Sequence, residues 1–197
     1  RNAEIVALQN RQLKELMLYP VLGAIAACLA GTSSIRYFAD SLVYKPGNLA
    51  GNESVVGWHT DLSYWRTCTS ESMLTVWIPF QDCTEEMGPI LYLDGSHQWP
   101  GTMDLRTFNC RDLADLEQRI LPAGQSMVKV PMTLRRGEVC FHHCRTVHGS
   151  GPNLTERPRI AYAIHMQDES NCFREFMNEN GERWRIYNDG LARRLSN

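Results

Sequence analysis

The spacing of hydrophobic and polar positions divides the chain into a short helical region and a longer region of strands. In residues 2–30, apolar positions at helical spacing are followed by an alanine-rich run, which predicts helix with a break at Pro20. From Ile35 onwards, short apolar or alternating segments end at turn-forming residues such as Pro46 and Gly47. The predicted strands cover residues 35–44, 73–80, 90–93, 127–130, 138–142 and 159–166.

Many short strands separated by loops are typical of a sandwich or a jelly-roll barrel, so we expect a mainly β fold with flanking N-terminal helices. Residues 102–124 contain a polar, helix-compatible piece that we interpret as an insertion or lid. The segment from Asn171 is polar and aromatic, with little periodicity. Since no repeat or shift in composition marks a second domain, we expect residues 1–197 to form a single domain. The first residue is not Met, so we expect some N-terminal sequence of the protein to precede it.

The segment Leu16–Gly31 is the part of the chain that most resembles a membrane or export signal. It has no charged residue over 16 positions, which is shorter than the roughly 20 residues of a membrane span. It follows a charged stretch, as the apolar part of a signal peptide does, but Glu4 and Glu15 fit such a signal poorly. We therefore interpret the segment as a buried amphipathic helix pair and expect no association with a membrane.

The charge balance and the cysteines exclude several classes of partner and compartment. With 20 Lys and Arg against 22 Asp and Glu, the net charge is −2, and no run of five basic residues occurs. Broad attraction to nucleic acid or to an anionic membrane is therefore not expected. The seven cysteines are irregularly spaced and form no CxxC motif. They indicate reduced thiols in a cytoplasmic protein rather than a disulfide framework.

His59 and Asp61 are the first indication of a metal site. On an extended segment, residues i and i+2 point to the same side, so this imidazole and this carboxylate can aim at one point. Any of the later histidines could supply a third ligand, and His148, at the end of a strand and loop, is the best candidate. Two histidines and one carboxylate form the facial triad that suits non-haem Fe(II) and leaves coordination positions open.

Arg159 begins a predicted strand eleven residues after His148. A guanidinium group pairs bidentately with a carboxylate, and the hydroxyl of Ser150 can share that carboxylate. A metal triad with a fixed arginine suits a dicarboxylic keto acid, because its keto-acid end can bind the metal while its far carboxylate pairs with the arginine. Arg157 has the same strand parity, but Pro158 favours a turn at Arg157 and the strand at Arg159.

The sequence from about residue 41 to residue 166 resembles the phytanoyl-CoA dioxygenase-like family of Fe(II)/2-oxoglutarate-dependent oxygenases. The resemblance depends on four motifs, which are WHTDLSYW (58–65), GPILYLDGSH (88–97), GEVCFHHCRTVHGSGPN (137–153) and RIAY (159–162). Together these motifs are specific, and the resemblance covers roughly two-thirds of the chain.

This resemblance implies a fold, a cofactor and a reaction. The fold would be a double-stranded β-helix, a cupin-like jelly roll. The activity would be hydroxylation of an unactivated C–H bond of a small molecule by Fe(II), 2-oxoglutarate and O₂, with release of succinate and CO₂. Halogenating relatives replace the carboxylate ligand with a small residue, so the presence of Asp61 favours hydroxylation. The residues that the resemblance assigns are the iron ligands His59, Asp61 and His148 and the 2-oxoglutarate contacts Arg159, Ser150 and Trp77.

No side chain beyond the three metal ligands is expected to take a catalytic role. Four other side chains are weaker candidates for the pocket, and these are Lys45, Trp65, His97 and His165. A second group, Cys140, His142 and Cys144, shares one face of a strand and could bind structural zinc. No second ligand pair lies at a suitable spacing, so we interpret His142 or His143 as a buried, hydrogen-bonded histidine of the core.

Three alternatives remain open for the site as a whole. The same ligands could serve desaturation, ring formation or epimerisation, a jelly-roll protein could hold a metal without turnover, or a zinc hydrolase could use the same triad. The intact triad with Arg159 favours the oxygenase, because neither a binding protein nor a hydrolase needs the arginine. The sequence does not identify the small-molecule substrate or the oligomeric state.

Overall fold

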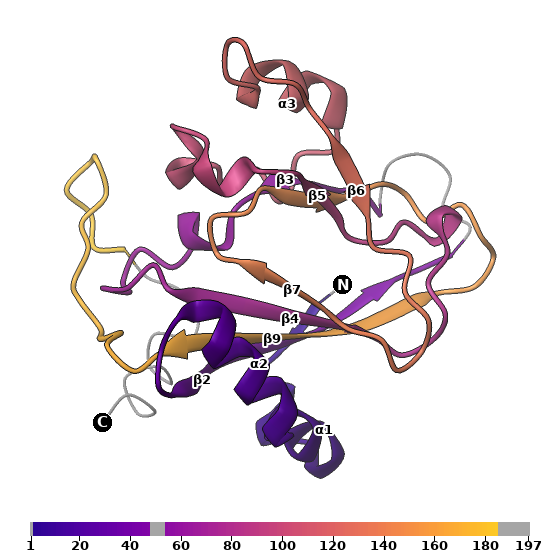
Figure 1. The fold of residues 1–197 in the computed structure, drawn as a ribbon. Coiled ribbons are helices and arrows are strands. Elements are labelled where there is room, and N and C mark those ends of the chain that lie inside the picture. Colours follow the sequence, from indigo (N-terminus) through magenta and orange to yellow (C-terminus); the bar gives the residue numbers. More distant parts are fainter. Residues whose placement is uncertain (1, 48–53, 185–197) are drawn as a thin grey trace.

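The computed structural model of the chain describes residues 2–47 and 54–184, which form two facing antiparallel sheets with helices on their outer sides (Figure 1). One sheet has five strands in the order β1-β2-β9-β4-β7, and the other has four in the order β3-β8-β5-β6. This arrangement confirms the predicted jelly roll. The strands are β1 (Asn2–Glu4), β2 (Ile35–Lys45), β3 (Val56–His59), β4 (Met73–Pro79), β5 (Leu91–Leu93), β6 (Lys129–Pro131), β7 (Cys140–His143), β8 (His148–Ser150) and β9 (Arg159–Asp168).

Helices cover the two sheets from opposite sides (Figure 1). Helices α1 (Arg11–Met17) and α2 (Pro20–Ala30) lie on the five-stranded sheet, and α3 (Leu113–Ile120) lies on the four-stranded sheet. Their ends follow local rules, since Pro20 is the first residue of α2 and Gly31, with φ of 65°, ends it. The short 3-10 turns are η1 (Val6–Leu8), η2 (Asp61–Ser63), η3 (Glu85–Met87), η4 (Ser96–Gln98) and η5 (Thr102–Asp104).

The two faces of the five-stranded sheet have different surroundings, because successive side chains along each strand point to opposite faces. The outer face packs against the helices. The buried side chains of this layer are Leu74, Val76 and Ile78 of β4 and Tyr162, Ile164 and Met166 of β9, and they pack with Leu22 and Ala26 of α2. The inner face carries the positions between these and lines a cavity between the sheets.

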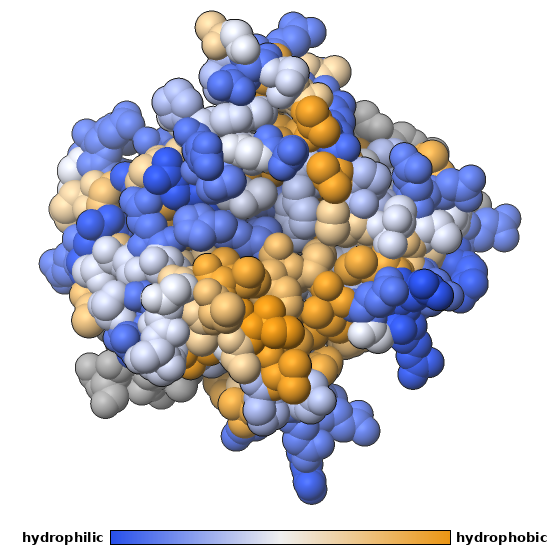
Figure 2. Space-filling view, viewed as in Figure 1, coloured by the Kyte–Doolittle hydropathy of each residue, from blue (hydrophilic) through white to orange (hydrophobic). Residues whose placement is uncertain are grey.

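The outer side of α2 is exposed, contrary to the expectation of a buried helix pair. Only Leu22 and Ala26 of this helix are buried, whereas Val21 is 50% exposed and Leu29 is 59% exposed. Hydrophobic surface gathers over the helices in the lower centre of Figure 2. Among the described residues no single helix is long and apolar enough to cross a membrane, although α1 and α2, bent by 40°, reach that length and composition together.

Most predicted strands are confirmed within two residues, and the differences have physical reasons. Residues 2–4 form an edge strand instead of helix, because they pair with β2 in the register Asn2 to Val43. The strand predicted at residues 127–130 is shifted to Lys129–Pro131, where it pairs with β5. Tertiary pairing overrides local propensity in both places.

Candidate metal centre

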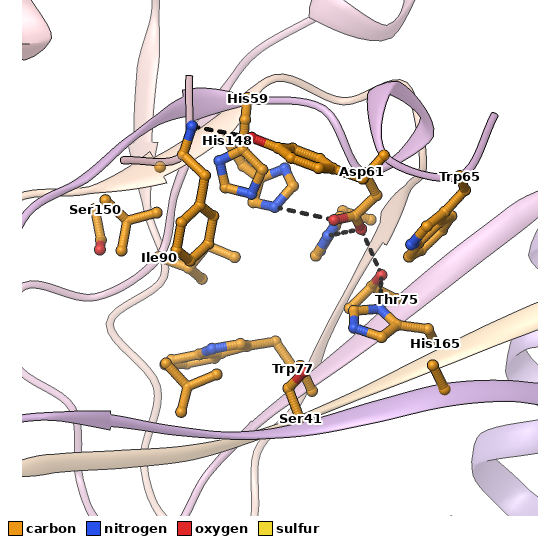
Figure 3. Close-up of a pocket in the computed structure, with 18 of the residues that line it drawn as sticks. Ser41, His59, Asp61, Trp65, Thr75, Trp77, Ile90, His148, Ser150 and His165 are labelled. Atoms are coloured by element: carbon orange, nitrogen blue, oxygen red, sulfur yellow. Dashed lines mark hydrogen bonds and ion pairs between the residues drawn. The ribbon is translucent and has the colours of Figure 1, made fainter. Parts of the chain in front are cut away.

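His59 and His148 lie opposite each other on adjacent strands, and Asp61 follows at the start of a short turn. His59 ends β3 and pairs with His148, the first residue of β8. Thr60 keeps an extended backbone, with φ of −115° and ψ of 144°, so Asp61 projects to the same side as His59. Ligand atoms of the three buried side chains lie within 4.8 Å of one another (Figure 3). The structure therefore brings together the three ligands that the sequence predicted.

Gly57 explains how the strand that carries His59 can lie so close to the neighbouring loop. A β-carbon at this position would lie 1.9 Å from the carbonyl oxygen of Thr107. The Gly57 amide instead donates to the carbonyl of Phe108 over 3.0 Å. This close approach holds the Phe108 ring against His59, with their ring centroids 4.9 Å apart.

Backbone carbonyls orient the two histidines with Nε2 free. His59 Nδ1 lies 2.7 Å from the carbonyl of Gly57, and His148 Nδ1 lies 3.0 Å from that of Thr146. A carbonyl accepts only, so each Nδ1 carries the proton and each Nε2 keeps a lone pair. Burial lowers the pKa of His59, and it lowers the pKa of His148 to about 4. Both imidazoles are therefore neutral near pH 7, as metal binding requires.

Asp61 has one oxygen engaged by protein and one directed towards the histidines. Its Oδ2 accepts from Thr75 Oγ1 over 2.7 Å and from His142 Nε2 over 3.1 Å. Its Oδ1 lies 3.6 Å from His148 Nε2. Burial alone would raise the pKa of Asp61, but His148 and His142 hold it well below its usual value. The carboxylate is thus ionised and presents Oδ1 as a single ligand atom.

Two further polar side chains extend this network in opposite directions. Thr75 Oγ1 also lies 2.8 Å from His165 Nδ1, and His142 Nδ1 lies 2.8 Å from the hydroxyl of Tyr92. Because Thr75 donates to Asp61, it accepts from His165, and because His142 donates through Nε2, its Nδ1 accepts from Tyr92. Sequence reasoning interpreted His142 or His143 as a buried, hydrogen-bonded histidine and named His165 as a weaker candidate for the pocket, but it missed Thr75 and Tyr92.

A second polar region of the cavity is built around Arg159. This side chain is only 2% exposed, and its Nε and Nη1 have no hydrogen-bond partner among the described residues. Its guanidinium carbon lies 5.4 Å from the ring centroid of Trp77. Lys45 pairs with Arg159 across β2 and β9, and its Nζ donates to Ser150 Oγ over 2.6 Å. Burial, with Arg159 nearby, lowers the pKa of Lys45 to about 6.

A buried arginine with no carboxylate beside it among the described residues indicates a site for a carboxylate, since a charge is rarely buried unpaired. Ser150 stands two residues beyond His148 on β8, so this anion site lies about 7 Å along the strand from the metal ligands. Arg157, the competing candidate, is exposed outside β9 and does not line the cavity.

The cavity that joins the two regions has a volume of about 360 Å³. Figure 3 shows Trp77 and Ser41 below it and His59 and His148 above it. Trp65 and His165 line it, whereas His97 is exposed and does not. Cys140, at one end of β7, and Cys144, beyond the other, lie in different clusters of buried residues. The described residues therefore hold no zinc site of the Cys140, His142 and Cys144 type.

Comparisons with protein families and curated proteins agree with this site. A family model described as phytanoyl-CoA dioxygenase (PhyH) matches residues 6–161. The peroxisomal phytanoyl-CoA dioxygenase of Bos taurus is 24% identical over 174 residues, covering 83% of this chain and 48% of the relative. A probable alpha-ketoglutarate-dependent hypophosphite dioxygenase of Stutzerimonas stutzeri is 28% identical over 126 residues, covering 61% and 41%. The chain thus spans about half the length of the curated relatives that it matches.

Solved structures with the same fold include two enzymes of nogalamycin biosynthesis. The non-haem alpha-ketoglutarate-dependent carbocyclase SnoK is 25% identical, with a TM-score of 0.74, and the match covers 98% of this chain and 69% of SnoK. The epimerase SnoN, solved with Fe³⁺, alpha-ketoglutarate and nogalamycin RO, is 26% identical with a TM-score of 0.69. That match covers 88% of this chain and 65% of SnoN.

Proposed function

Because this chain belongs to the phytanoyl-CoA dioxygenase family, we propose that it is an Fe(II)- and 2-oxoglutarate-dependent oxygenase that hydroxylates an unactivated C–H bond of a small molecule. The observation that carries the proposal is the pairing of a facial triad with an unpartnered buried arginine in one cavity. We treat residues 1–197 as one oxygenase domain, because both sheets contribute residues to this cavity. No disulfide joins any of the cysteines, all of which lie in the described residues, and this supports our placement of the enzyme in the cytoplasm.

The donor set fits Fe(II). His59 and His148 offer neutral Nε2 atoms, and Asp61 offers an ionised Oδ1. Two imidazoles and one carboxylate on one side leave positions open, as the non-haem iron oxygenases require. His142 and Thr75 hold the other oxygen of Asp61 and so fix the orientation of this ligand.

Arg159, with Lys45 beside it, fits the far carboxylate of 2-oxoglutarate. The free Nε and Nη1 of Arg159 can donate to it in the bidentate geometry that guanidinium groups favour. Ser150 and Lys45 can add hydrogen bonds, and the Trp77 ring lies against Arg159 from the side of β4. The separation of this anion site from the triad suits a five-carbon dicarboxylate that reaches from one to the other.

The protein positions the reactants and excludes water. Iron with 2-oxoglutarate and O₂, when bound, supplies the oxidising power to break an unactivated C–H bond. The rings of Tyr64, Trp65 and Phe108 line the cavity beside the ligands and keep this region apolar. No side chain has to act as a general base. The hydrogen bonds around Asp61 hold this proposed metal ligand in place and do not transfer a proton to or from a substrate.

Epimerisation or ring closure is the second candidate, because the structural neighbours SnoN and SnoK are named as an epimerase and a carbocyclase. Mass spectrometry of the product separates the reactions. Hydroxylation adds one oxygen atom from ¹⁸O₂ to the product, epimerisation leaves its mass unchanged, and ring closure removes two hydrogen atoms.

An anaerobic titration tests the proposal. We expect Fe(II) followed by 2-oxoglutarate to produce the visible charge-transfer band of the iron chelate. Asp61→Ala should abolish the band, and Arg159→Ala should raise the 2-oxoglutarate dissociation constant by about 100-fold, since it removes a bidentate charged pair. Arg157→Ala, an exposed arginine two residues away, is the matched control and should bind normally. Absence of the band with iron bound would overturn the proposal.

A further inference from the structure

Glu4 is a charged residue of the cavity wall that the proposed function does not use. Within the part of the chain that the structure describes, three charged side chains other than histidines line the cavity, and these are Glu4, Asp61 and Arg159. Asp61 serves the metal, and Arg159 serves the cosubstrate. Glu4 therefore sets the charge of the remaining part of the cavity, where a substrate would bind.

The sheet register places Glu4 far from the arginine. Glu4 pairs with Ser41, Ser41 with Ala163, and Ala163 with Trp77, so these positions form one row across four strands. Three strand spacings, or about 14 Å, separate the backbones at the two ends of this row. Arg159 precedes Ala163 by four residues on β9, so it lies about 13 Å further along the sheet. The cavity thus has a cationic end for the cosubstrate and a separate acidic edge.

The acidic edge is preorganised. Glu4 Oε2 accepts a hydrogen bond from Ser41 Oγ over 2.5 Å. Asp40 fixes the segment that follows, because its carbonyl accepts from the Ile5 amide over 2.8 Å and its Oδ2 accepts from the Ala7 amide over 2.9 Å. Glu4 forms no ion pair with any Lys, Arg or His among the described residues. Its negative charge is therefore available to a ligand.

Aromatic rings make up much of the wall of the same cavity. Tyr64, Trp65, Phe108 and Trp184 all line the cavity. Trp184 Nε1 donates to the Tyr64 carbonyl over 3.3 Å, and Tyr64 OH accepts from the Phe108 amide over 3.2 Å, so three of the rings form one connected wall. Arg106 packs 4.8 Å from the Trp184 ring centroid, but it is not part of the cavity lining. A carboxylate with aromatic rings is the environment that recognises an organic cation.

We propose that the substrate of this enzyme is an organic amine whose protonated nitrogen pairs with Glu4 while its apolar body lies among the aromatic rings, with the reacting carbon towards the metal triad. The inference rests on the proposed function and names the substrate class of that same site. An anionic substrate such as a free acid is disfavoured at this edge, because its carboxylate would lie against Glu4, which forms no ion pair among the described residues.

Three small probes of matched shape and different charge test the proposal. These are phenethylamine, which is protonated at pH 7.5, neutral 2-phenylethanol and anionic phenylacetate. Their dissociation constants are measured by ligand-observed NMR on the chain loaded anaerobically with Fe(II) and 2-oxoglutarate, and the charge-transfer band is recorded before any probe is added. We expect phenethylamine to bind about tenfold more tightly than 2-phenylethanol, and phenylacetate to bind most weakly.

Variants at Glu4 assign the preference to this carboxylate. Glu4→Gln keeps an acceptor for Ser41, so it should fold, keep the band and bind 2-phenylethanol normally, but lose the tenfold preference for the amine. Glu4→Lys should reverse the preference towards phenylacetate. Glu85→Gln, an exposed acid of η3, is the matched control and should retain the preference of the unmodified chain.

Each outcome has a separate meaning. If the band forms but the amine binds no better than the alcohol, the substrate class is wrong and the oxygenase proposal stands. If the amine preference survives in Glu4→Gln, the assignment to Glu4 is wrong. If the band does not form, the oxygenase proposal fails, whatever the probes show.

Discussion

Replacing Thr75 with valine tests whether the side chains around Asp61 hold this metal ligand in place. The Thr75 hydroxyl donates to Asp61 Oδ2 over 2.7 Å and lies 2.8 Å from His165 Nδ1. Valine keeps the branched shape of the side chain and removes both hydrogen bonds. A hydrogen bond to a charged group contributes about 1.5–3 kcal/mol. We therefore expect the metal-free variant to lose about 2 kcal/mol of unfolding free energy, or roughly 4–8 °C in Tm for a chain of this size.

The same substitution should weaken metal binding. Asp61 Oδ2 would keep only the bond from His142, 3.1 Å long, so the carboxylate would rotate more freely. Loss of such an outer partner lowers metal affinity about 10–100-fold, which corresponds to about 1.4–2.8 kcal/mol and matches the energy of the lost bond. Anaerobic Fe(II) titration against a competing chelator measures this change.

A buried threonine whose side chain does not contact the triad provides the control for Thr75→Val. Thr102 Oγ1 donates to the neutral carbonyl of Trp99 over 3.2 Å and does not line the cavity. Thr102→Val should cost about 1 kcal/mol of stability and leave Fe(II) affinity unchanged. An Fe(II) affinity for Thr75→Val within twofold of the unmodified chain would refute the reasoning.

Three further predictions follow from burial. Burial lowers the pKa of Lys45 to about 6, so the lysine is neutral at pH 8. Binding of 2-oxoglutarate beside it should therefore take up as much as one proton. Calorimetry in buffers of different ionisation enthalpy should show this uptake, and Lys45→Met should abolish it. Burial lowers the pKa of His148 to about 4, whereas the unfolded value is about 6.5, so the unfolded state binds more protons between these values. The metal-free chain should therefore lose stability as pH falls from 6.5 to 4, by up to about 1.4 kcal/mol per pH unit from this histidine. Denaturant unfolding at several pH values measures this loss. An unfolding free energy that stays constant over this range would contradict the prediction. Leu22→Ala, in the buried face of α2, should cost about 2–5 kcal/mol, whereas Val21→Ala, 50% exposed, should cost less than about 1 kcal/mol in thermal unfolding.

The residues of the proposed metal and anion sites could be named from the sequence because each has a local signal. His59 and Asp61 are two residues apart on extended backbone, so their shared direction follows from the period of a strand. Arg159 begins a strand after Pro158, and strand parity then directs it inwards. These inferences require only the backbone geometry of a few neighbouring residues.

Thr75 and Tyr92 could not be predicted in the same way, because their contacts depend on cross-strand register. Thr75 lies in a run of apolar residues and reaches Asp61 only because β4 pairs with β9 and β7 at that position. Tyr92 meets His142, 50 residues away, through the packing of one sheet against the other. Glu4 lies in a segment whose composition favours helix, and its position in the cavity follows from pairing with β2.

Alternate residues of β9 pack in the helix-covered core and line the cavity. Tyr162, Ile164 and Met166 pack under the helices, whereas Arg159 and His165 face the cavity. A shift of one residue in the pairing of β9 would therefore turn the arginine to the outer face of the sheet and place apolar side chains beside the proposed metal ligands. Since both faces oppose this shift, the helix-covered core also sets the position of the anion site. Substitutions in that core should accordingly change 2-oxoglutarate affinity only when they change the register of β9, and otherwise alter stability alone.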